Sequence, residues 1–292
     1  MAVAEVYRSM RLAECEQRAF LLYAVGIPSE IVPIDGEFVL VVAENVRDRA
    51  LNELRRHEAE SHAAFVPPPV TVKLHAGAWI GVLGYALIML FAAWCAGENL
   101  FGVDWREAGA LRGSVAQTGE WPRLVTALTL HGDVAHLMAN LAFGVFFGYF
   151  AGQMLGPGVA WLSILIGAVL GNLLDSLLMS TGSSSIGAST AVFATLGLVA
   201  AHSWRQRSDS RMRWAHRWAP LIAGVALLAF TGAGGENTDV IAHVTGFLCG
   251  ALLGVLHAWK PLASLDDWRV QLAAGLICAG VILGAWGAAL IH

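Results

Sequence analysis

Residues 239–259 read DVIAHVTGFLCGALLGVLHAW, and this stretch decides the class of fold. It is long enough to cross a bilayer as one helix, because about 20 predominantly apolar residues suffice. Gly246, Gly250 and Gly254 recur every four residues and form a smooth face that another helix can approach closely. His243 lies near the start of the stretch. An ionisable side chain at membrane depth is costly and therefore indicates a functional site.

Six similar stretches occur elsewhere in the 292 residues. We predict seven membrane spans in total, at about 76–96, 134–155, 158–179, 189–204, 218–232, 239–259 and 270–290. The composition agrees, since 14% of the residues are charged and the mean hydropathy is +0.61. Soluble proteins contain about 25% charged residues, so the composition argues against a single soluble globule, and it excludes a disordered chain. The net charge of −4 argues against a nucleic-acid partner.

The first 66 residues differ from the rest, because they hold 18 of the 40 charged residues. Residues 14–26 have helical apolar spacing, and Asp35-Gly36 between the apolar runs 31–34 and 38–42 predicts a β-hairpin. Asn45 is expected to cap a second helix that ends near Glu60. We therefore predict a small α+β domain over residues 1–66, followed by a Pro-rich linker over residues 67–75.

The distribution of basic residues predicts the orientation. The loop between the fourth and fifth spans carries Arg205, Arg207, Arg211, Arg213 and Arg217, whereas residues 180–188 and 233–238 carry no Lys or Arg. The arginine-rich loop is therefore expected in the cytoplasm. Counting spans from it places the N-terminal domain in the cytoplasm and the C-terminus outside. The excess of Arg over Lys and the abundant Ala and Gly indicate a GC-rich bacterial genome, and hence a bacterial cytoplasmic (inner) membrane.

Four polar residues are predicted at one level near the outer face. Ser189 opens the fourth span and His243 opens the sixth, and both spans run from outside to inside. His136 and Asn140 lie one helical turn apart at the outer end of the second span. Taken singly, Ser189 is better explained as a helix N-cap and His243 as a helix-contact residue. Together they fit a nucleophile with its base, beside donors that could bind an oxyanion.

These residues resemble the rhomboid family of intramembrane serine proteases. The resemblance covers roughly residues 76–260 and rests on separate motifs in the right order. They are Gly119–Leu124 with Trp121 and Arg123, His131-x4-His136-x3-Asn140, Gly187-x-Ser189, and Ala242-His243-x-x-Gly246-x-x-x-Gly250. It implies an all-α polytopic fold, with a six-helix protease core over residues 76–260. Residues 261–292 would add a seventh transmembrane helix.

The resemblance also implies an activity. Ser189 and His243 would form a catalytic dyad, and His136, Asn140 and the Ser189 N–H would form the oxyanion hole. The enzyme would be a serine endopeptidase that needs no cofactor or metal and cleaves transmembrane segments of membrane proteins near the outer face. Its partners would be those substrates and the bilayer, and its oligomeric state stays open. A mobile gate is expected around the fifth span and residues 232–239.

Three positions depart from the family pattern, namely Pro122, Thr190 and Thr245, and none of them removes a catalytic group. Two other functions stay open. A rhomboid-like protein that binds transmembrane helices without cutting them usually lacks the Ser or the His, and this chain keeps both. A transporter or receptor fits seven spans, but the polar residues cluster at one level and no internal repeat is evident. The absence of an HExxH motif disfavours a metalloprotease.

Overall fold

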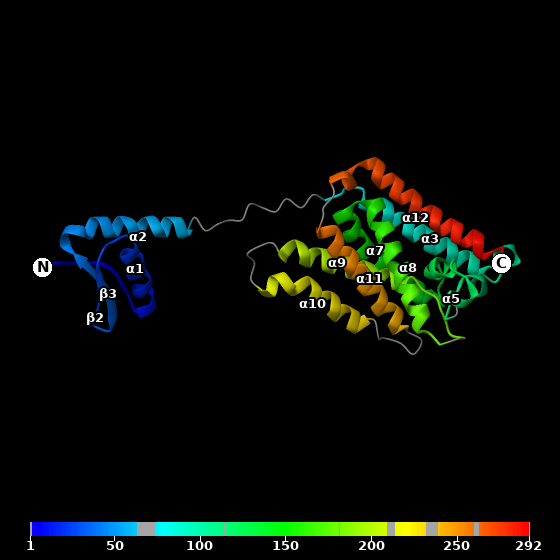
Figure 1. Cartoon of the computed structure of the whole chain (residues 1–292), viewed down its shortest axis with the longest axis horizontal. Helices are drawn as coiled ribbons and strands as arrows, with labels where there is room; N and C mark the ends of the chain where they lie inside the picture. The colour runs from blue at the N-terminus through cyan, green and yellow to red at the C-terminus, as the bar shows by residue number, and fades with distance from the viewer. Residues whose placement is uncertain are drawn as a thin grey trace. The chain divides into compact units, whose positions relative to one another are not determined.

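The computed structural model describes residues 2–62, 74–113, 115–180, 182–208, 214–231, 239–259 and 263–291 (Figure 1). The chain divides into two compact units, Met1–Thr71 and Val72–His292. Most of the predicted Pro-rich linker over residues 67–75, much of the arginine-rich loop and most of the predicted gate lie outside the described residues.

The N-terminal unit is a three-stranded antiparallel sheet with two helices. In chain order its elements are β1 (Val3–Ser9), α1 (Leu12–Ala24), β2 (Ser29–Ile34), β3 (Glu37–Ala43), η1 (Glu44–Val46) and α2 (Arg47–His62). The predicted hairpin is present: Asp35 and Gly36 both have positive φ, 51° and 83°, and join β2 to β3. Side chains of both helices and of the sheet share one core, which includes Leu22, Leu40 and Leu54.

Two details of this unit differ from the prediction. Strand β1 was not expected, because its exposed residues Glu5 and Arg8 make the segment read as polar. It pairs along β3, so a partner distant in sequence stabilises it. Asn45 lies inside η1 and does not cap α2, which begins at Arg47.

The second unit is helical. Its long helices are α3 (Ala78–Gly97), α7 (Val134–Leu155), α8 (Pro157–Leu178), α9 (Ser189–Ser208), α10 (Trp214–Thr231), α11 (Val240–Trp259) and α12 (Trp268–Ala289). Its short elements are η2 (Leu100–Gly102), α4 (Trp105–Gly109), β4 (Leu111–Arg112), α5 (Val115–Thr118), α6 (Arg123–Thr126), η3 (Ala127–Thr129), β5 (Ser184–Ser185) and η4 (Ala263–Asp266). Most of the short elements lie between α3 and α7, and we call residues 98–133 the long loop.

The long helices coincide with the predicted spans to within a few residues. Among the described residues, five are long and apolar enough to cross a membrane: α3, α7, α8, α11 and α12. Helix α10 is apolar but shorter, and α9 ends in the polar run HSWRQRS. Five of the seven predicted spans are therefore long and apolar enough to cross a membrane. The other two, α9 and α10, stay predictions.

Helices α8, α9 and α11 pack so closely that glycine is required at their contacts. A Cβ added at Gly250 of α11 would lie 1.9 Å from the Ala194 carbonyl oxygen of α9, and one at Gly246 would lie 2.5 Å from that of Thr190. A Cβ at Gly171 of α8 would lie 2.8 Å from the Gly246 Cα. The prediction that the glycine face of 246–254 receives another helix is confirmed. The order of these contacts makes α9 and α11 parallel.

Candidate active site

Ser189 is the first residue of α9, and it is half-buried. The backbone N–H of Gly187, two residues earlier, donates to the Ala127 carbonyl in the long loop (2.9 Å). Just upstream, β5 pairs with β4, so Ser185 lies opposite Leu111. The loop before Ser189 is thus attached to the long loop by backbone hydrogen bonds. Two-residue strands carry no signal in the sequence, and this pairing was not predicted.

The His136 ring and the Ser189 hydroxyl border the same small space. His136 lies in the first turn of α7, where its N–H donates to the Asp133 carboxylate (2.8 Å). A Cβ added at Gly187 would lie 2.8 Å from His136 Cε1, 2.9 Å from its Nε2 and 3.5 Å from Ser189 Oγ. Gly187 also has φ +145°. Glycine is therefore needed here both for its backbone conformation and for the space that it leaves open.

Asn140 follows His136 by one turn on α7 and is buried. Its backbone carbonyl accepts a hydrogen bond from the Tyr85 hydroxyl of α3 (2.9 Å). Its side-chain Nδ2 has no hydrogen-bond partner among the described residues. A buried amide donor without a partner is costly, and such groups call for a functional explanation.

His243 is buried in the first turn of α11, which begins after Asp239. The Asp239 carboxylate accepts the Ala242 N–H (3.1 Å) and its carbonyl accepts the His243 N–H (3.2 Å). The His243 ring lies 4.3 Å from the ring of Phe193, one turn after Ser189 on α9. The parallel packing of α9 and α11 therefore brings Ser189 and His243 to the same end of two adjacent helices.

Two of the three departures from the family pattern have structural roles: Thr190 packs between helices, and Thr245 forms a hydrogen bond within α11. The Thr190 methyl carbon lies 3.0 Å from the position of a Cβ at either Gly171 or Gly246, so it fills the space those glycines leave. The Thr245 hydroxyl donates within its own helix, to the Ile241 carbonyl (2.9 Å). Neither threonine replaces one of the four candidate residues, Ser189, His243, His136 and Asn140.

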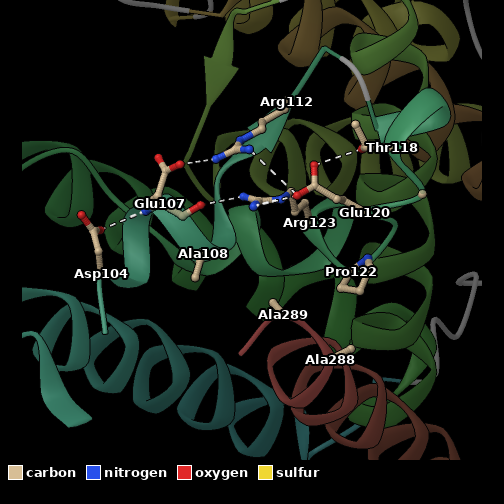
Figure 2. Close-up of a pocket in the computed structure, with 11 residues that line it drawn as sticks. Asp104, Glu107, Ala108, Arg112, Thr118, Glu120, Pro122, Arg123, Ala288 and Ala289 are labelled. Atoms are coloured by element: carbon tan, nitrogen blue, oxygen red, sulfur yellow. Dashed lines mark hydrogen bonds and ion pairs between the residues drawn. The ribbon is translucent and has the colours of Figure 1, made fainter. Parts of the chain in front are cut away.

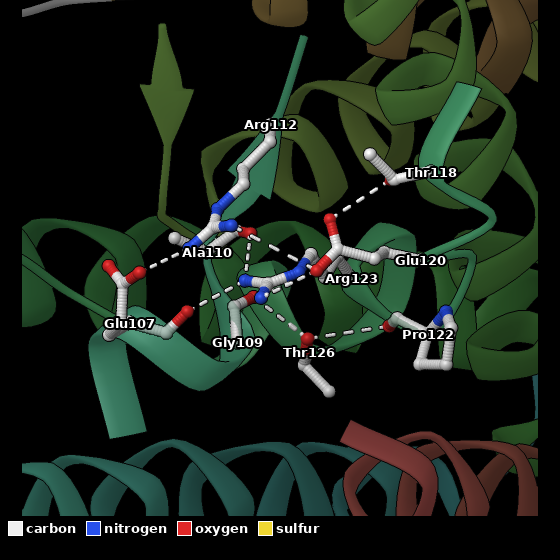
Figure 3. A network of polar contacts seen from close by, with 9 residues as sticks. All are labelled: Glu107, Gly109, Ala110, Arg112, Thr118, Glu120, Pro122, Arg123 and Thr126. Atoms are coloured by element: carbon white, nitrogen blue, oxygen red, sulfur yellow. Dashed lines mark hydrogen bonds and ion pairs between the residues drawn. The ribbon is translucent and has the colours of Figure 1, made fainter. Parts of the chain in front are cut away.

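Arg123 and Trp121 belong to the long loop. Arg123 is 8% exposed, and its guanidinium donates to the carbonyls of Glu107 (2.7 Å) and Ala110 (3.0 Å) and pairs with the Glu120 carboxylate (3.0 Å) (Figure 3). Trp121 is exposed. Arg123 therefore joins α4 to α6, which is a structural role for this motif residue.

A cavity of about 890 Å³ lies beside this network, between the long loop and the end of α12 (Figure 2). Partial burial raises the pKa of Glu120, but the hydrogen bond from Thr118 and the charges of Arg123 and Arg112 outweigh it. The pKa of Glu120 is therefore lowered. The lining does not include Ser189, His243, His136 or Asn140. It consists of Asp104, Glu107, Ala108, Arg112, Thr118, Gly119, Glu120, Pro122, Arg123, Ala288 and Ala289.

His131, just before α7, is 5% exposed, and its ring lies edge-on to that of His136 at 5.1 Å. Burial, and secondly the proximity of His136, lower the pKa of His131 to about 4. His131 is therefore neutral at physiological pH. In the part of the chain that the structure describes, no three His, Cys, Asp or Glu side chains are grouped as a metal site would require.

The model of the Rhomboid domain matches residues 118–260. That range begins in the long loop and ends after α11, so it contains all four candidate residues. The chain is a member of the rhomboid family. With its apolar helices it is a multi-pass integral membrane protein.

Curated relatives agree with this assignment. Over 166 residues, the chain is 31% identical to "Rhomboid-like protease 3" of Toxoplasma gondii, an alignment that covers 55% of this chain and 61% of that protein. It is 30% identical over 175 residues to "RHOMBOID-like protein 7" of Arabidopsis thaliana, which covers 58% and 53%. It is 28% identical over 189 residues to "Rhomboid-like protease 1" of Toxoplasma gondii, which covers 60% and 62%. The chain thus spans 53–62% of the length of these relatives.

Proposed function

We propose that this rhomboid family member is an intramembrane serine endopeptidase. Ser189 is the nucleophile and His243 its general base. His136, Asn140 and the Ser189 backbone N–H stabilise the oxyanion. The substrates are transmembrane segments of other membrane proteins, cut near the outer end of the bundle. The N-terminal unit lies in the cytoplasm and the C-terminus outside, in a bacterial inner membrane.

One observation carries the proposal: the His136 ring and the Ser189 hydroxyl face the same space beside Gly187. A nucleophile and a charge-stabilising donor must both lie close to one reacting carbonyl. Buried Asn140, one turn along the same helix, supports this role, because its Nδ2 has no hydrogen-bond partner among the residues that the structure describes. Such a donor gains its partner only when negative charge develops, which favours the transition state over the ground state.

The chemistry follows from these positions. His243 accepts the proton of the Ser189 hydroxyl as Oγ attacks the scissile carbonyl carbon. The carbonyl oxygen becomes an oxyanion, and the donors of His136, Asn140 and Ser189 stabilise it. When the C–N bond breaks, His243 returns the proton to the leaving amine. Water then hydrolyses the acyl-enzyme by the same steps, which regenerates Ser189.

The test is cleavage of a model transmembrane substrate in liposomes, together with labelling by a fluorophosphonate probe. We expect wild type to cleave and to be labelled, and Ser189→Ala to do neither. Ser185→Ala is the matched control, because Ser185 is another half-buried serine four residues upstream. It should retain both reactions.

Other results would change the assignment. Equal cleavage by wild type and Ser189→Ala would show that Ser189 is not the nucleophile. If wild type is neither active nor labelled but still binds transmembrane helices, the chain is a binding protein without catalytic activity.

A further inference from the structure

Helix α12 lies outside the residues matched to the Rhomboid domain, and most of its side chains are at least partly exposed. Its buried residues are Gln271, Ala274 and Trp286. Gln271, near its start, accepts the backbone N–H groups of Gly158 (2.8 Å) and Val159 (3.1 Å) at the start of α8. Between its two ends α12 also packs against a cluster of side chains from α6, η3 and α8. Trp286, near its end, forms a hydrogen bond with the long loop.

The Trp286 side chain lies between α12 and the long loop. Its indole Nε1 donates to Thr129 Oγ1 (3.1 Å), and its ring lies 4.7 Å from that of Trp105. A Cβ added at Gly109 would lie 2.6 Å from Trp286 Cη2, so the ring rests on glycine backbone. Trp286 is 9% exposed, whereas Trp268 at the other end of α12 is 68% exposed.

Two routes lead from Trp286 to the loop that precedes Ser189. The first is polar: Thr129 ends the η3 turn, and in the same turn the Ala127 carbonyl accepts the Gly187 N–H (2.9 Å). The second is apolar: Trp286 belongs to a cluster with Cys95, Trp105 and Leu130, and Ile186 packs against that cluster. Ile186 and Gly187 directly precede Ala188-Ser189.

We infer that Trp286 is a positioning residue for the nucleophile, and that α12 acts on the proposed reaction through it. The inference rests on the proposed function. The indole N–H fixes the Thr129 hydroxyl, which itself donates to the Thr126 carbonyl (2.8 Å). This holds the η3 turn, and the turn holds Gly187 through its N–H. Loss of the indole N–H frees this turn and misaligns Ser189 relative to His136.

The experiment uses the full chain in detergent and in liposomes. Trp286→Phe removes the N–H donor together with part of the ring that packs on Gly109. Thr129→Val removes the hydroxyl acceptor with little change in side-chain shape. Since a net hydrogen bond corresponds to about a fivefold change in rate, we expect each variant to lower kcat and the fluorophosphonate labelling rate by about that factor, with KM nearly unchanged. The double variant should lose less activity than the product of the two single losses, because both changes remove the same Trp286–Thr129 hydrogen bond.

Two controls separate positioning from general destabilisation. Trp268→Phe changes an exposed tryptophan of the same helix and should behave as wild type. Thr129→Ser keeps the hydroxyl and should restore the labelling rate. If folded Trp286→Phe is labelled as fast as wild type, the inference is wrong and Trp286 serves stability alone. If wild type itself is not labelled, the proposed function fails and this inference falls with it.

Discussion

Asn140 and Asn172 show how one residue type takes two roles in the same bundle. Both are buried, at 6% and 3% exposure. The Asn172 side chain donates to the Leu124 carbonyl (2.9 Å), so it joins α8 to the long loop. Asn140 Nδ2 has no partner among the described residues. The side chain of Asn172 therefore forms its hydrogen bond within the fold, whereas Asn140 Nδ2 is available to a bound group.

This contrast leads to a prediction. Asn140→Ala should lower kcat about 100-fold, the effect of losing one oxyanion donor, with little loss of thermal stability. Asn172→Ala should instead destabilise the protein by about 1–3 kcal/mol, because it leaves the Leu124 carbonyl unpaired. Cleavage kinetics and thermal unfolding in detergent measure the two effects. A large fall in stability for Asn140→Ala with unchanged kcat would show that Asn140 is structural.

His131 predicts a pH dependence of stability. Its pKa is about 4 in the folded protein and about 6.5 in an unfolded chain. Between these values the unfolded state binds the extra proton, so the free energy of unfolding falls as the pH drops from 6.5 towards 4. The loss is about 3 kcal/mol at most. Thermal unfolding between pH 4 and 7 should show it, and His131→Phe should flatten the curve. An unchanged slope in the variant would assign the dependence to other groups.

At the scale of elements, the contact of α8, α9 and α11 decides where the candidate residues lie. Ser189 and His243 stand at the beginnings of two helices whose backbones nearly touch at Thr190 and Gly246. Close approach of this kind needs small residues, because lipid-buried helices associate through packing. A change in the spacing of α9 and α11 would therefore move the two candidate residues apart.

Gly250→Ala tests this packing. Its added Cβ would lie 1.9 Å from the Ala194 carbonyl oxygen, so the helices must separate. We expect a loss of about 1–3 kcal/mol of stability, as for other overpacked cores, and a parallel loss of fluorophosphonate labelling. Gly280→Ala in α12 is the control, since no atom of the described residues lies within 4 Å of its added Cβ. It should be neutral or stabilise by up to about 1 kcal/mol, because alanine favours helix. Equal unfolding temperatures for the two variants would contradict the packing argument.

At the scale of the whole molecule, two units with separate cores share one chain. The arginine distribution predicts that the N-terminal unit lies in the cytoplasm, and the fold adds a relation within the second unit. Trp286 near the end of α12 lies against the long loop, so both belong to the same end of the bundle as Ser189. If the long loop faces outward, so does the end of α12.

Cysteine labelling tests the proposed orientation. With the four native cysteines replaced, we expect Phe101→Cys in the long loop to react with a membrane-impermeant maleimide in intact cells. Phe20→Cys in α1 should react only after the membrane is permeabilised. Both positions are well exposed, at 88% and 73%, so access to the reagent is limited by the membrane alone. Labelling of Phe20→Cys in intact cells would reverse the orientation.

Features that depend on neighbouring residues could be predicted from the sequence. The apolar stretches mark the helices, Asp35-Gly36 marks the hairpin, and the spacing of Gly246, Gly250 and Gly254 marks a helix contact. The motifs indicate which residues to consider for chemistry. Strand β1 was missed because its pairing with β3 depends on residues far along the chain. The same reason hides the pairing of β4 with β5.

The sequence alone determined the membrane class and the helical segments, because apolar periodicity and turn chemistry act over a few residues. Its resemblance to the rhomboid motifs supplied the candidate residues. Only the tertiary structure decided that Gly187 leaves the space shared by His136 and Ser189, and that Asn140 Nδ2 has no partner in the described part of the chain. It also decided that Trp286 reaches Thr129, 157 positions away in the chain. Such relations arise when distant segments pack together, and packing depends on the shapes of all the partners at once.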